Sequence, residues 1–74
     1  MKVNVKLFAS LRTLGPDEQI IELPDHATID DIIHCLKIPS TIRLLRIVNG
    51  EHRPPDHILT DCDELALFPP IAGG

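Results

Sequence analysis

The sequence predicts an α+β fold in which one helix lies across one face of a small mixed sheet of four to five strands. Three observations predict it: an opening segment alternates polar and apolar residues, a central segment carries a helical apolar stripe, and strand-like segments lie on both sides of it. The predicted order along the 74 residues is strand, strand, helix, strand, short elements and strand. One helix buries its single apolar stripe against one face of such a sheet.

The first two strands are predicted from local pattern. Residues 2–8 alternate polar and apolar side chains, so the odd-numbered apolar ones point to one face. Residues 18–23 form a second strand, with Ile21 and Leu23 on the inner face. The segment 9–17 contains Leu-Gly-Pro-Asp, which is typical of a loop. We therefore expect the two strands to form an antiparallel hairpin.

The helix is the clearest local prediction. Its apolar stripe has the spacing i, i+3, i+4 and i+7 and consists of Ile29, Ile32, Ile33 and Leu36. Thr28 stands just before the stripe and Asp31 follows three positions later, a spacing at which each side chain can bond the backbone of the other. Pro39 prevents the helix from continuing further.

The second half of the chain completes the sheet. A strand over 43–48 leads into Asn49-Gly50, a strong hairpin-turn signal because both residue types tolerate positive φ. The remaining segments are an irregular stretch over 51–57 containing two prolines, a turn region over 58–63 and a final strand over 64–68. This order is the β-grasp arrangement, in which the first and last strands lie side by side and parallel in the middle of the sheet. We expect a single domain over 1–74, with an extended tail over 69–74.

Composition narrows the classes of function. A net charge of −4 argues against a nucleic-acid binder, which normally carries a basic patch, and against an anionic membrane surface as partner. The sequence has no apolar run of spanning length and does not open with a signal-peptide pattern, so we expect a cytoplasmic protein. The two cysteines, Cys35 and Cys62, are expected to be unpaired thiols in a reducing compartment.

The candidate site is the tail. Two prolines keep the exit from the last strand extended, and the final Gly73-Gly74 can pass through a channel too narrow for Cβ atoms. The terminal carboxylate could thus be presented inside another protein's active site. Adenylation would turn this poor acyl donor into an acyl-adenylate, which a sulfur nucleophile could convert to a thiocarboxylate. The structural alternative is that the two glycines are simply a frayed end.

Four segments resemble the MoaD/ThiS sulfur-carrier family and together cover nearly the whole chain. The ending 67–74, Leu-Phe-Pro-Pro-Ile-Ala-Gly-Gly, is the most specific and points towards the molybdopterin synthase small subunit, MoaD. The segment 59–65 resembles the family's L-x-D-G-D-E-hydrophobic run. The opening 5–12 is similar to the start of molybdopterin synthase small subunits, and 47–50 fits the family's central V-N-G/D turn.

The resemblance implies a ubiquitin-like β-grasp protein that carries sulfur on Gly74. An E1-like, MoeB-like adenylyltransferase would activate the terminal glycine with ATP, and the loaded tail would donate sulfur inside a MoaE-like large subunit of molybdopterin synthase, in molybdenum cofactor biosynthesis. The chain itself would bind no cofactor or metal and would hold no catalytic side chain. The implied site comprises Gly74 and Gly73 as the acyl end and Phe68, Pro69, Pro70, Ile71, Ala72 and Phe8 as partner-binding residues.

Other functions stay open at this point. A ThiS-like carrier for thiamine thiazole synthesis would use the same tail with a different acceptor enzyme. A ubiquitin-like modifier would form an amide with lysines of target proteins. A plain β-grasp binding module would make no use of its tail.

The side chain of Phe68 is the hardest to place from sequence. Leu65 and Leu67 already supply the inner face of the last strand, so alternation puts Phe68 on the opposite face. An exposed aromatic beside a tail favours a docking role over a core role. Phe8 is a weaker candidate for the same surface.

One residue departs from the family pattern. Cys62 occupies the position where the family usually has the glycine of an Asp-Gly-Asp turn, which supplies positive φ; a turn of another type is the alternative. Asp61 and Asp63 are expected to raise the pKa of the Cys62 thiol and so to lower its reactivity. We interpret Asp61, Asp63 and Glu64 as a solvated turn rather than an acid/base cluster, and the histidines and cysteines lack the spacing of a metal site.

Overall fold

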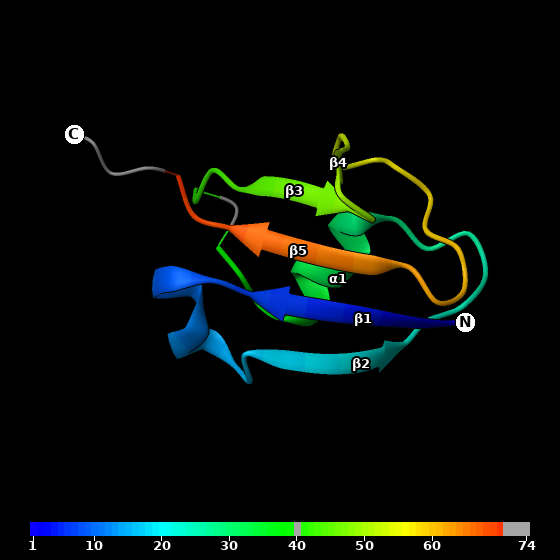
Figure 1. The fold of residues 1–74 in the computed structure, drawn as a ribbon, viewed down its shortest axis with the longest axis horizontal. Coiled ribbons are helices and arrows are strands. Elements are labelled where there is room, and N and C mark those ends of the chain that lie inside the picture. The colour runs from blue at the N-terminus through cyan, green and yellow to red at the C-terminus, as the bar shows by residue number, and fades with distance from the viewer. Residues whose placement is uncertain (40, 71–74) are drawn as a thin grey trace.

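The computed structural model describes residues 1–39 and 41–70 and contains a five-stranded mixed sheet with one helix across one face (Figure 1). The elements are β1 (Lys2–Leu7), the 3-10 helix η1 (Ala9–Leu14), β2 (Glu18–Glu22), α1 (Ile29–Cys35), β3 (Leu45–Val48), β4 (Glu51–His52) and β5 (Glu64–Phe68). The strand order is β2-β1-β5-β3-β4, with β1 and β5 parallel and the other neighbours antiparallel. The predicted β-grasp arrangement is confirmed.

The hairpin of β1 and β2 forms as predicted. Its register pairs Val3 with Ile21 and Val5 with Gln19, and the odd-numbered apolar residues of β1 are buried. The predicted loop over 9–17 is only partly irregular, because η1 occupies its first six residues. Leu11 is buried on this short helix, and that burial explains why the segment is ordered.

Helix α1 begins at the predicted capping box. The amide of Asp31 donates to the Thr28 hydroxyl over 3.2 Å, and the amide of Thr28 donates to the Asp31 carboxylate over 2.9 Å. The helix ends at Cys35, so the last residue of the predicted stripe, Leu36, is the C-cap and is half-buried. Lys37 then adopts a φ of 59°, which turns the chain before Pro39.

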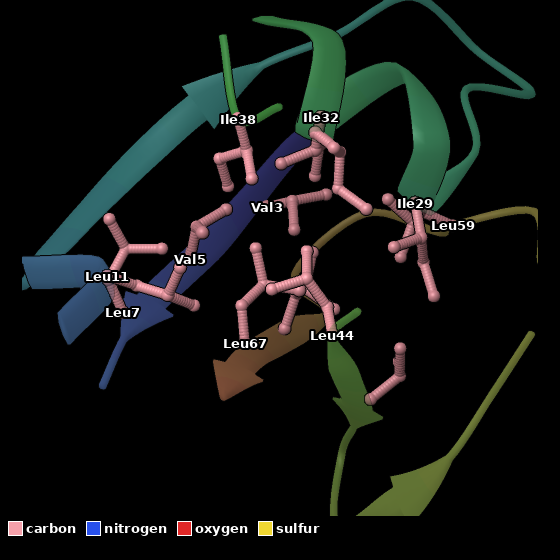
Figure 2. Packing of buried hydrophobic residues seen from close by; sticks show 13 residues of the cluster. Val3, Val5, Leu7, Leu11, Ile29, Ile32, Ile38, Leu44, Leu59 and Leu67 are labelled. Carbon is pink, nitrogen blue, oxygen red and sulfur yellow. The ribbon is translucent and has the colours of Figure 1, made fainter. Parts of the chain in front are cut away.

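The core is aliphatic and lies between α1 and the inner face of the sheet (Figure 2). Fourteen apolar residues are buried: Val3, Val5, Leu7, Leu11, Ala27, Ile29, Ile32, Ile33, Ile38, Leu44, Val48, Leu59, Leu65 and Leu67. The two aromatic side chains are absent from this set. The core therefore leaves both phenylalanines available for the opposite face of the sheet.

The second half of the sheet differs from prediction in its boundaries. Strand β3 begins at Leu45 rather than at residue 43. The turn at Asn49 and Gly50 has φ values of 51° and 85°, as the sequence predicted for a tight hairpin. The segment predicted to be irregular therefore opens with strand residues, because this turn brings β4 back against β3; the following prolines keep β4 to two residues.

The turn before β5 keeps the conformation that a glycine would provide. Cys62 has a φ of 69°, so a turn of another type does not form. The amide of Cys62 donates to the carbonyl of Lys2 over 2.8 Å, which fastens the turn to the start of β1. A side chain with a Cβ is thus held in the left-handed region, at a cost in stability.

Replacing Cys62 with glycine should stabilise the fold. We expect the free energy of unfolding to rise by about 0.5–1 kcal/mol, because the strain at positive φ is relieved and only part of the gain is offset by the freer unfolded chain. Urea denaturation measures the change. In the matched variant Gly50→Ala, where φ is 85°, stability should fall; a loss of stability in Cys62→Gly would contradict the argument.

Candidate functional site

Strand β5 leads directly into the two prolines of the predicted tail. Phe68 is the last strand residue, Pro69 is half-buried and Pro70 is exposed. The predicted site residues Ile71, Ala72, Gly73 and Gly74 lie outside the described part of the chain. The geometry available for the site is therefore that of the surface from which the tail leaves the sheet.

Phe68 and Phe8 form one stacked pair on the face of the sheet opposite the core. Their ring centroids are 4.3 Å apart and the ring planes are inclined by 10°. Phe68 is half-buried and Phe8 is 36% exposed, so the pair contributes a flat apolar surface rather than core packing. The two residues that the sequence singled out separately are brought together.

Backbone pairing explains why these rings meet. The amide of Phe8 donates to the carbonyl of Leu67 over 3.1 Å, which continues the parallel pairing of β1 and β5 by one residue. The next residue, Ala9, has a φ of 53° and turns the chain away from the sheet into η1. Phe8 is thereby left beside Phe68, and both side chains follow buried leucines, which fixes them on the outer face.

Strand β3 widens this surface. Leu45 pairs with Phe68 and Ile47 pairs with Ala66, so these side chains also lie on the outer face. Leu45 is 45% exposed, although it is a large apolar residue within a strand. We call the five residues Phe8, Leu45, Ile47, Ala66 and Phe68 the tail-base patch. A contiguous apolar surface of this kind is typical of an interaction site.

The sequence prediction missed two members of the tail-base patch, Leu45 and Ile47. The run 43–48 is apolar at four of its six positions, so alternation alone does not separate its two faces. The structure separates the two faces through the burial of Val48 beside the Asn49-Gly50 turn, which the sequence alone does not give. Counting back two positions at a time from Val48 places Arg46 with it on one face and leaves Leu45 and Ile47 on the other.

A shallow hollow of about 350 Å³ adjoins the tail-base patch at Phe8. It is lined by Lys6, Leu7, Phe8, Arg12, Asp17 and Glu18. Arg12 and Asp17 form an ion pair across it, and the hydrogen bond from the guanidinium lowers the pKa of the Asp17 carboxyl. The apolar surface therefore has a charged rim on the side of η1, the arrangement usual for protein interfaces.

Cys62 lies away from the tail-base patch. Its amide donates to the carbonyl of Lys2, beside the N-terminus, and Figure 1 shows the N-terminus and the end of β5 at opposite ends of the sheet. A hydrogen bond to Asp61 and the charge of that carboxylate raise the pKa of the Cys62 thiol, as predicted. Both cysteines are exposed and unpaired. A thiol of this kind is a poor nucleophile at neutral pH, which argues against a redox role for it.

The prediction of a solvated acidic turn is wrong for Asp63. This side chain is only 7% exposed, and its carboxylate accepts three hydrogen bonds. The donors are the amide of Thr60 (2.8 Å), the hydroxyl of Thr60 (3.0 Å) and the side-chain amide of Asn49 (2.9 Å). Burial would raise the pKa of Asp63, but these hydrogen bonds outweigh it and hold the pKa below its usual range. Asp63 is therefore a structural residue, and it is not placed for acid/base chemistry.

Two further observations bear on the class of site. Across residues 1–39 and 41–70, no group of three or more histidine, cysteine or acidic side chains is placed to hold a metal ion. Over the same residues, no helix has the length and apolarity needed to cross a bilayer.

The comparisons with known proteins agree with the predicted resemblance. Residues 5–74 match the ThiS family. A molybdopterin synthase sulfur carrier subunit from Dictyostelium discoideum is 36% identical, and the match covers 96% of this chain and 94% of the relative. The predicted membership of the MoaD/ThiS family is confirmed.

Solved structures give the same family and the same fold. A Pyrococcus furiosus protein described as a molybdopterin converting factor subunit 1 is 32% identical, with a TM-score of 0.81 over 96% of this chain and 99% of the other. The small archaeal modifier protein 1 of H. volcanii is 28% identical, with a TM-score of 0.75 over 95% of this chain and 98% of the other.

Proposed function

This chain belongs to the ThiS family, and from that membership we propose that it is a sulfur carrier that serves as the small subunit of a molybdopterin synthase. Two similar proteins support the assignment by name, a molybdopterin synthase sulfur carrier subunit and a molybdopterin converting factor subunit 1. The single observation that carries the proposal is the position of the tail-base patch. An exposed apolar surface lies where β5 passes into a Pro-Pro-x-x-Gly-Gly ending.

The proposed chemistry takes place on the carboxylate of Gly74. A MoeB-like activating enzyme joins this carboxylate to the AMP part of ATP and releases pyrophosphate. A sulfur nucleophile then displaces AMP, and a thiocarboxylate is left at the chain end. No side chain of the carrier takes part in these steps, so the energy and the catalytic groups come from the partners.

The tail-base patch is proposed to dock the MoaE-like large subunit, and the same surface meets the activating enzyme. Docking at the base of the tail would limit where the chain end can reach and so raise its effective concentration inside the partner's site. Phe68 stands at the centre of this proposal, since Leu45 is its pairing neighbour and Phe8 is stacked on it.

The direct test is the intact mass of the protein after incubation with ATP, a sulfur donor and the cognate activating enzyme. Replacing one carboxylate oxygen by sulfur adds about 16 mass units to the chain. The gain should be absent when Gly74 is deleted and when the sulfur donor is left out. No gain with an enzyme of proven activity would contradict the sulfur-carrier assignment.

A second candidate function is protein modification. The similarity to small archaeal modifier protein 1 favours it, because an activated Gly74 could equally be attacked by a lysine amine of a target protein. Covalent adducts of slower migration that require Gly74 would identify a modifier. The ThiS-like alternative differs only in the acceptor, and the large subunit that co-purifies with the chain distinguishes the two carriers.

A further inference from the structure

We propose that the free edge of β2 is a second docking site, which accepts an extended peptide strand with the pattern basic-x-apolar-x-basic. The site does not depend on the sulfur-carrier assignment. It lies at the opposite side of the sheet from β3, where Figure 1 shows β2 as the outermost strand. Addition of a strand to an exposed sheet edge is an established mode of peptide recognition.

The backbone of β2 leaves three residues with outward hydrogen-bonding groups. Met1 and Leu23 exchange both of their backbone hydrogen bonds at 2.8 Å, and Leu7 donates to Asp17 over 2.8 Å. Odd-numbered residues of this hairpin strand therefore bond β1. The amides and carbonyls of the even-numbered residues 18, 20 and 22 point away from β1, and no hydrogen bond to them occurs within the described residues.

The side chains of the same three residues share the outer face of the sheet. Ile20 is 69% exposed, the most exposed large apolar residue in the described chain. Glu18 and Glu22 flank it two positions away on either side. Strand β2 contains no proline or lysine, so its protection against unselective pairing consists of the charges of its two glutamates. The other edge strand, β4, offers only two residues.

Charge decides what can pair with this edge. In the hairpin, Glu22 lies opposite Lys2 and Glu18 lies opposite Lys6. A strand with basic residues opposite both glutamates would complete a Lys–Glu–basic ladder across three strands, with an apolar residue on Ile20. A second copy of this chain would instead bring its own glutamates against these two, in either strand direction, which is unfavourable.

The β2 edge is separate from the tail-base patch. The outer-face residues of β1, which lie between the two surfaces, are all polar: Lys2, Asn4 and Lys6. Asn4 donates to the Glu18 carboxylate over 2.8 Å, which holds one glutamate of the edge in place. A peptide bound at β2 would therefore leave Phe68, Leu45 and Ile47 accessible, and the two surfaces approach each other at the hollow that Glu18 and Phe8 both line.

An NMR titration of the ¹⁵N-labelled protein tests the proposal. The probe is the capped peptide Thr-Lys-Thr-Val-Thr-Lys-Thr, and the control peptide has glutamate in place of both lysines. We expect saturable shifts centred on the amides of residues 18, 20 and 22, and binding of the control peptide weaker by at least tenfold. Ile20→Pro should also weaken binding by about tenfold, because it removes an outward amide and no hydrogen bond to β1.

Three outcomes would overturn the proposal. The first is equal affinity for both peptides, and the second is a set of shifts confined to the tail-base patch. The third is a change in the chemical shifts of the β2 amides with protein concentration in the absence of peptide, which would make a second copy the occupant. Should Ile20→Pro lose the native spectrum, the double variant Glu18→Lys with Glu22→Lys replaces it. That variant must prefer the glutamate peptide, and an unchanged preference would overturn the proposal.

Discussion

Replacement of Phe68 by aspartate is expected to weaken the complex with a molybdopterin synthase large subunit by at least 100-fold. Phe68 lies at the centre of the tail-base patch, and removal of a central aromatic from an interface typically costs 2–4 kcal/mol, where about 2.7 kcal/mol corresponds to 100-fold. The introduced carboxylate would add the cost of burying an unpaired charge. The fold should persist, because Phe68 is outside the buried core.

Titration calorimetry with the purified large subunit measures this effect, and thermal unfolding checks the fold. Ile58→Asp is the matched control: Ile58 is 53% exposed and lies outside the tail-base patch, so binding should stay within a factor of two or so. Leu45→Asp should resemble Phe68→Asp, since the two residues are strand neighbours. Full affinity in Phe68→Asp would mean that the tail alone holds the complex, and the docking role of the patch would have to be abandoned.

The elements of the fold that depend on local pattern could be predicted from the sequence. Alternation fixed β1 and β5, and the stripe that begins at Ile29 with its Thr28 capping box fixed α1. The Asn49-Gly50 turn predicted a hairpin after β3, although it did not predict the length of β4. These features are set by residues close together in the sequence, so a single sequence is enough to predict them.

The features that depend on distant pairing could not be predicted. Leu45 belongs to the tail-base patch because β3 pairs with β5 in one register, and register is a property of two strands. The burial of Asp63 depends on Asn49, fourteen positions earlier, whose side chain reaches it across the sheet. In the segment 9–17, the Gly-Pro signal correctly marked a chain reversal, but the burial of Leu11 that orders η1 comes from the rest of the fold.

Asp63→Asn is expected to lower the free energy of unfolding at pH 7 by about 3 kcal/mol. The carboxylate accepts three hydrogen bonds, and bonds to a charged acceptor contribute about 1.5–3 kcal/mol each when they are well sheltered. An asparagine keeps one acceptor oxygen and replaces the other by an NH₂ donor. This donor would face either the amide of Thr60, or the side-chain amide of Asn49 together with the hydroxyl of Thr60. The loss also affects Asn49, whose own side-chain oxygen accepts from the amide of Glu64 at 2.9 Å.

The pH dependence distinguishes the charge of Asp63 from its shape. Its folded-state pKa is depressed below the ordinary value, so the carboxylate contributes stability above the unfolded pKa of about 3.9 and loses it as pH falls through the folded pKa. The difference in free energy of unfolding between the native chain and Asp63→Asn should therefore have its full value at pH 7, begin to decrease near pH 4 and vanish at lower pH. Urea denaturation at several pH values measures it, with the exposed Asp56→Asn as a control that changes stability by less than about 0.5 kcal/mol. A gap that is constant from pH 7 to pH 3 would show that packing around Asp63 stabilises the turn, and that its ionised carboxylate does not.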